Sequence, residues 1–135
     1  LAAAGVAAAV LVPRWLRARR RTRRLADTGD ARADTLSAWE EVCEVVADLE
    51  LSCPGGSPRF AAERLVGSLG GDAGAAEALR SLAAASERAL FDRSENFDLP
   101  GRWGAEVDAI TAALTAQARE RAGKRKSARP RRVAR

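Results

Sequence analysis

The fold is decided by the stretch DTLSAWEEVCEVVADL, residues 34–49. Its apolar side chains recur every three or four positions, the spacing that places side chains on one face of an α-helix. This apolar stripe consists of Leu36, Trp39, Cys43, Val46 and Leu49. Acidic residues take the opposite face, at Glu40, Glu41, Glu44 and Asp48. The stretch therefore predicts an amphipathic helix that packs one face on a core and leaves an acidic face in solvent.

The ends of this helix are marked by capping residues and by residues that break helices. Asp34 or Thr35 can cap its start, and Ser37 with Glu40 offers a capping box one turn later. Its end is expected near Leu51, because Pro54-Gly55-Gly56 cannot continue a helix.

Three more helices follow the same logic. Ser57-Pro58 combines an N-cap with a proline at the first helical position, which predicts a helix over residues 57–68. Asp72 can cap a third helix that reaches Phe91. After a loop over residues 94–101, a fourth helix is expected from Trp103 towards Arg121.

No segment shows the period-two alternation of a β-strand, so the predicted class is all-α, a small four-helix bundle-like domain. Its core is expected to be rich in alanine and modest in area. The larger core residues predicted from the helical stripes are Leu36, Trp39, Cys43, Val46, Leu65, Leu79, Leu82, Leu90, Trp103, Val107, Ile110 and Leu114.

The first 24 residues have a different character. Residues 1–12 contain no polar side chain, and residues 14–24 contain seven arginines. An apolar run followed by a tryptophan and clustered positive charge is typical of a membrane helix at its cytoplasmic end. The residues predicted to lie at the membrane interface are Arg14, Trp15, Arg17, Arg19, Arg20, Arg21, Arg23 and Arg24. Anionic lipid headgroups are the partner that this cluster predicts.

Twelve helical residues rise only about 18 Å, whereas a bilayer core is about 30 Å thick. The run is therefore interpreted as the end of a membrane helix whose first part lies upstream, in line with the initial Leu1. The predicted organisation is a membrane helix end and arginine-rich exit over residues 1–24, a linker over 25–33, a helical domain over 34–122, and a disordered basic tail over 123–135. The localisation predicted is the cell membrane, with the helical domain on the cytoplasmic side.

The charge is distributed unevenly along the chain. The formal net charge is +5, but residues 25–118 hold 7 basic against 17 acidic residues, a local net charge of −10. The basic residues are concentrated in residues 14–24 and 119–135. A nucleic-acid-binding domain would be expected to carry basic residues on its folded face, so this distribution disfavours nucleic acid as the partner.

The chain contains no histidine. This excludes a Cys-His or Ser-His-Asp mechanism within these residues and removes the commonest metal ligand. Cys43 and Cys53 are too few for a disulfide framework or a zinc site. No catalytic residue, metal ligand or cofactor-binding residue is predicted, and no enzymatic activity is expected of this part of the protein.

The chain resembles the cytoplasmic C-terminal domain that follows the last membrane helix of actinobacterial transglutaminase-like membrane proteins. Besides the arginine-rich exit and the basic tail, the resemblance is carried by Ala38-Trp39-Glu40-Glu41, Ala47-Asp48-Leu49, Ser57-Pro58-Arg59, Ala62-Glu63-Arg64-Leu65 and Glu87-Arg88-Ala89-Leu90-Phe91. It implies a multi-pass parent protein whose papain-like transglutaminase domain, with a Cys-His-Asp site, lies outside the cell and upstream. None of those catalytic residues can be mapped onto this sequence.

Two functions from different classes follow. The first is a membrane-anchored cytoplasmic interaction or regulatory module that binds another membrane or cytoplasmic protein and is not itself catalytic. The alternative is a nucleic-acid-binding protein that uses its basic C-terminal tail, where Lys124-Arg125-Lys126 and Arg129-Pro130-Arg131-Arg132 would contact phosphates.

Overall fold

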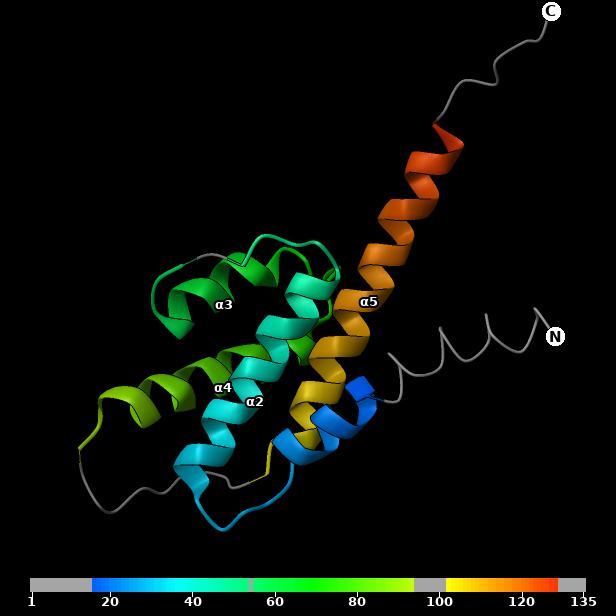
Figure 1. The fold of residues 1–135 in the computed structure, drawn as a ribbon. Helices are drawn as coiled ribbons and strands as arrows, with labels where there is room; N and C mark the ends of the chain where they lie inside the picture. Colours follow the sequence, from blue (N-terminus) through cyan, green and yellow to red (C-terminus); the bar gives the residue numbers. More distant parts are fainter. Residues whose placement is uncertain (1–15, 54, 94–101, 129–135) are drawn as a thin grey trace, which may run out of the picture.

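The computed structural model describes residues 16–53, 55–93 and 102–128. Within these ranges every regular element is a helix, which confirms the predicted all-α class. Residues 16–24 form a helical segment, called here the arginine segment. It is followed by α2 (Ala31–Asp48), α3 (Pro58–Val66), α4 (Ala73–Phe91) and α5 (Gly104–Ser127), as Figure 1 shows. Among these described helices, none combines the length and the apolar character needed to cross a lipid bilayer.

The start of α2 lies before the predicted position. Asp30 is the N-cap, and its carboxylate accepts hydrogen bonds from the backbone N–H groups of Arg32 and Ala33 at 3.1 and 3.0 Å. The predicted cap Asp34 is instead buried within the helix, where its carboxylate accepts hydrogen bonds from the backbone N–H and the hydroxyl of Thr28. The last three residues of the predicted linker over 25–33 are therefore helical.

At its other end α2 closes without a glycine. Glu50 takes a left-handed backbone conformation with φ of 55°. Its N–H donates to the carbonyl of Ala47, and the N–H of Leu51 donates to the carbonyl of Val46, both at 3.0 Å. This pattern satisfies carbonyls at the helix end in the manner that glycine usually permits.

The starts of α3 and α4 agree with the sequence. The hydroxyl of Ser57 accepts from the N–H of Phe60 at 3.3 Å, and Pro58 occupies the first helical position. The carboxylate of Asp72 accepts from the N–H of Ala75 at 2.9 Å. Each helix thus begins at the capping residue that the sequence predicted.

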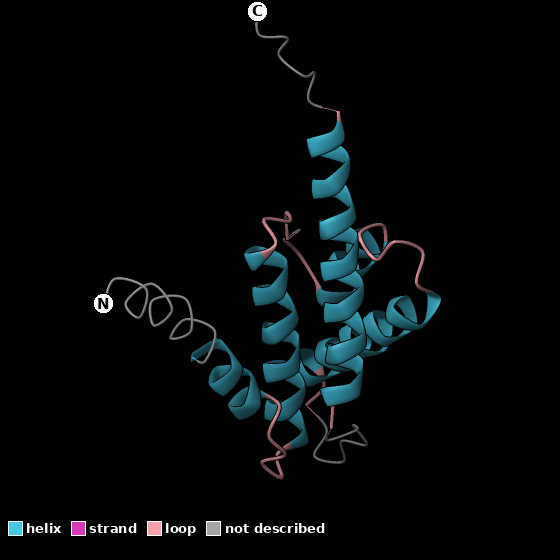
Figure 2. Cartoon of the chain, turned by 90° about the vertical axis from the view of Figure 1, so that its right-hand side faces the viewer, coloured by secondary structure: helices cyan, strands magenta, loops and turns pink. Residues whose placement is uncertain are grey.

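The last helix, α5, is longer than predicted. Residues 123–127, assigned to a disordered tail, belong to this helix, which runs through Gly123 to Ser127. Lys124 pairs with Glu120 one turn earlier at 2.8 Å, and basic residues near a helix C-terminus interact favourably with the helix dipole. Residues 129–135 of the predicted tail lie outside the described part. In both views α5 extends past the other helices (Figures 1 and 2).

Helix α4 is central to the packing. It contacts α2, α3 and α5, and α2 also packs against α5. The fully buried apolar side chains that join these helices are Val42, Val46, Leu79, Leu82, Val107, Ile110 and Leu114. Much of the remaining core is alanine, including Ala75, Ala76, Ala83, Ala85 and Ala89 of α4, so the helices approach one another closely.

Eight of the predicted core side chains are buried: Val46, Leu65, Leu79, Leu82, Trp103, Val107, Ile110 and Leu114. Leu36, Trp39 and Cys43 are only partly buried, because the buried face of α2 is turned towards Thr35, Ala38 and Val42. The expectation for Leu90 is wrong, since this residue is 51 % exposed. In the last turns of α4 the buried face passes from Ser86 to Ala89, three positions on, and leaves Leu90 outside.

Candidate functional site

The candidate site is the contact between the arginine segment and the acidic side of α2. Arg17 pairs with Asp48 of α2 at 3.6 Å, and Arg24 pairs with Glu41 and Glu44 of the same helix. Arg21 pairs with Asp108 at the start of α5. The segment is therefore joined by ion pairs to two different helices, and Figure 2 shows it set obliquely against the bundle.

Arg24 makes the best-buried of these contacts. Its guanidinium donates to Glu44 at 2.6 Å and to Glu41 at 3.3 Å. The side chains of Arg24 and Glu41 are only 26 % and 9 % exposed, so this pair is shielded from solvent on the side of Glu41. The hydrogen bond from Arg24 lowers the pKa of Glu44, and the same bond raises the pKa of Arg24.

The other two pairs are more exposed and contribute less. The side chains of Arg17 and Asp48 are 68 % and 54 % exposed, and such pairs add about 0–1 kcal/mol to stability. Asp108 is 71 % exposed beside an Arg21 that is 30 % exposed. Together these contacts place the segment beside α2 and α5.

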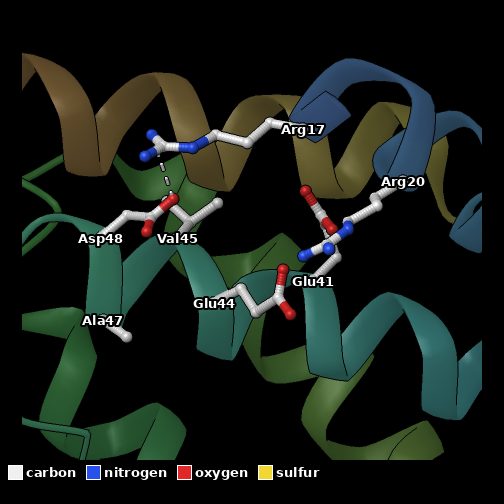
Figure 3. A pocket seen from close by; sticks show the side chains of 7 residues that line it. All are labelled: Arg17, Arg20, Glu41, Glu44, Val45, Ala47 and Asp48. Carbon is white, nitrogen blue, oxygen red and sulfur yellow. Dashed lines mark ion pairs between the residues drawn. The ribbon is translucent and has the colours of Figure 1, made fainter. Parts of the chain in front are cut away.

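A pocket of about 300 Å³ lies between the segment and α2 (Figure 3). Figure 3 shows Arg17 and Arg20 reaching from the segment towards α2, where Glu41, Glu44 and Asp48 face them. Guanidinium and carboxylate groups alternate around this space, with Val45 and Ala47 as its apolar part. A lining of both signs favours pairing within the chain over the capture of a ligand of one charge.

The predicted membrane-interface residues are placed in three ways. Arg17, Arg21 and Arg24 contact acidic groups of the bundle. Arg19 and Arg23 are exposed, and so is Arg20, which lines the pocket against the acidic side of α2. Arg14 and Trp15 lie outside the described residues. The contact of this cluster with lipid headgroups stays a prediction.

Sequence reasoning missed the polar residues that face inward. Glu41 was assigned to the solvent side of α2, yet it is 7 % exposed because Arg24 covers it. Thr35 was considered only as a cap, yet it is fully buried and accepts a hydrogen bond from the indole N–H of Trp103 at 2.9 Å. A count of apolar positions gives no signal for such residues, because their partners lie far away in the sequence.

The two cysteines differ in their surroundings. Burial, followed by the neighbouring Cys53 thiol and the Glu40 carboxylate, raises the pKa of Cys43 to about 12. Cys43 is therefore a protonated thiol at neutral pH and a poor nucleophile. Cys53 is exposed in the connection between α2 and α3. In the part of the chain that the structure describes, no three histidine, cysteine or acidic residues are grouped so that they could hold a metal ion.

Comparison of the chain with protein-family models, with curated proteins and with solved structures found no match.

Proposed function

We propose that this chain is a non-catalytic helical interaction module, held at a membrane by the apolar run of residues 1–12, with its bundle on the cytoplasmic side. The observation that carries the proposal is the Arg24 cluster with Glu41 and Glu44. This cluster makes the arginine segment, which follows the apolar run after residues 13–15, a part of the folded domain. A domain tethered in this way would be held close to its anchor and in one orientation.

The chemistry of the chain supports a role in binding. It contains no histidine, and Cys43 is kept protonated by burial. The partner would be a membrane or cytoplasmic protein that meets the bundle near the bilayer. The resemblance to the C-terminal domain of transglutaminase-like membrane proteins extends this proposal: the chain would be the cytoplasmic part of a multi-pass protein whose catalytic domain lies across the membrane.

The tether can be tested by flotation of the full chain with neutral phosphatidylcholine vesicles. The native chain is expected to float with the vesicles, whereas a V6K/V10K variant should stay behind, because each lysine opposes insertion of an apolar helix by about 3 kcal/mol. The matched control is S52K/S81K, which adds the same two charges at exposed positions of the bundle and should float like the native chain. If the full-length protein, with any residues that precede Leu1, does not float, the tether is refuted.

The orientation can be tested in intact cells with a membrane-impermeant maleimide. Cys53 is exposed and should react only after the membrane is permeabilised. Cys53→Ser is the control, because Cys43, whose pKa is raised to about 12, should not react in the folded protein. Labelling of Cys53 in intact cells would place the bundle on the outer side and contradict the proposal.

A further inference from the structure

The end of α5 carries a second dense cluster of positive charge in the described part of the chain, besides the arginine segment. We call residues 119–127 the basic end of α5. Its basic residues are Arg119, Arg121, Lys124, Arg125 and Lys126, and all of them are exposed. One acidic residue, Glu120, lies among them and pairs with Lys124. The basic end therefore presents an unneutralised excess of positive charge to solvent.

The start of the basic end lies beside the C-terminal end of α2. Leu49 to Leu51, which follow α2, line one pocket together with Ala118, Arg121 and Arg125 of α5. Arg17, at the start of the arginine segment, pairs with Asp48, the last residue of α2. Arg17 from one end of the sequence and Arg121 and Arg125 from the other thus lie near the C-terminal end of α2.

The basic residues do not form one stripe. At 100° per residue, positions 119, 121, 124, 125 and 126 are distributed around the helix, so α5 has no apolar face in this region that could insert between lipid chains. What remains is an electrostatic contact. Such a contact depends on the density of positive charge and needs no apolar face.

From this placement we infer that the basic end of α5 is a second membrane contact, which binds the anionic headgroups of the leaflet that the arginine segment faces. The inference rests on the proposed tether, because the tether brings this end of the bundle to a lipid surface. Nucleic acid is the weaker partner. A nucleic acid that extended along α5 from its basic end towards the bundle would be repelled there. Residues 25–118 carry a net charge of −10, from 7 basic and 17 acidic residues.

The test measures partition of the full chain onto vesicles of phosphatidylcholine alone and of phosphatidylcholine mixed with phosphatidylglycerol, at low ionic strength. The α5 variant is R121Q/R125Q/K126Q, in which glutamine keeps a good helix propensity. The matched control is R59Q/R64Q/R80Q, at exposed positions of α3 and α4. Removing three positive charges from the formal +5 leaves +2 in both variants. Circular dichroism checks that both keep the helical content of the native chain.

The native chain is expected to prefer the anionic vesicles. The α5 variant should reduce this preference on the order of 100-fold, since each basic side chain near an anionic surface adds about fivefold in affinity. The control should keep the preference of the native chain. Binding of all three proteins to neutral vesicles should be equal, because the apolar run alone provides it.

The outcomes separate the two proposals. If the full-length protein, with any residues that precede Leu1, fails to bind neutral vesicles, the tether is wrong, whatever the α5 variant does. If neutral binding holds but the α5 variant keeps the full anionic preference, the second contact is refuted and the arginine segment accounts for the preference. An equal loss in the control would refute it as well, because net charge would then explain the effect. A variant that loses binding to duplex DNA but not to anionic vesicles would assign the basic end to nucleic acid instead.

Discussion

The indole N–H of Trp103 donates a hydrogen bond to the hydroxyl oxygen of Thr35 at 2.9 Å, and both residues are buried. The Thr35 hydroxyl donates in turn to the carbonyl of Ala31 at 2.7 Å. This chain of hydrogen bonds joins the first turn of α2 to the residue that precedes α5. It also satisfies both polar groups inside a core that is mostly apolar.

Replacing Thr35 by valine keeps the shape of the side chain and removes the acceptor of Trp103. The free energy of unfolding should fall by about 1–3 kcal/mol, the cost of leaving a buried donor without a partner. Thr22→Val is the control. The hydroxyl of Thr22 makes the same kind of bond, to the carbonyl of Ala18 at 2.9 Å, but at an exposed position. Urea denaturation of both variants checks the prediction, which fails if the two lose equal stability.

The burial of α4 predicts a large difference between two leucines of the same helix. Leu82 is fully buried, so Leu82→Ala should reduce the free energy of unfolding by about 2–5 kcal/mol. Leu90 is 51 % exposed, and Leu90→Ala should change it by less than about 0.5 kcal/mol. Thermal or urea unfolding compares the two. A comparable loss in both variants would mean that Leu90 belongs to the core after all.

Glu50 offers a stabilising substitution. Its φ of 55° lies in the left-handed region, where a side chain costs about 1–2 kcal/mol that glycine does not incur. Glu50→Gly should therefore raise the free energy of unfolding by up to about 1 kcal/mol, after allowance for the greater freedom of glycine in the unfolded chain. The same exchange at Glu40, inside α2, should lower it by about 1 kcal/mol. If both variants lost stability, the left-handed backbone conformation of Glu50 would not be a source of strain.

The ion pair of Arg24 predicts how stability depends on pH. Because the hydrogen bond from Arg24 lowers the pKa of Glu44 below its ordinary value of 4.5, the unfolded state binds the proton more readily than the folded state. The contribution of this pair is complete above the ordinary pKa and is lost as the pH falls through the lowered one. Since the side chain of Glu44 is 52 % exposed, the contribution is small and decreases with salt.

Measurement of unfolding at low salt from about pH 6 to about pH 3 tests this dependence. Glu44→Gln should flatten the loss of stability towards acid pH. Glu77→Gln, at an exposed position of α4, should leave the slope nearly as it is in the native chain. If the free energy of unfolding of Glu44→Gln fell with pH as steeply as that of the native chain, the Arg24–Glu44 pair would not contribute to acid unfolding.

The sequence was sufficient for the features that are local. The caps Ser57 and Asp72 each act within three residues, so the starts of α3 and α4 could be predicted from the residues alone. The start of α2 was missed because Asp30 stands in a run that reads as a linker. The length of α5 was missed because Gly123 and the adjacent positive charges suggested an end to the helix.

The candidate site was harder to predict because its contacts are distant in the sequence. The arginine cluster was recognisable as a cluster, but its pairing with Glu41, Glu44 and Asp108 depends on how α2 and α5 are placed in space. The buried face of α2 was misassigned for the same reason. Thr35 and Glu41 are polar by type, and only Trp103 and Arg24, from elsewhere in the fold, make their burial favourable.

The arginine segment is attached to α2 near both of its own ends and to α5 between them. Attachment to two helices at three positions restricts rotation of the segment as well as its translation. Because these contacts join the segment to two helices, a displacement applied at residue 16 would be passed to α2 and α5 directly as well as along the chain.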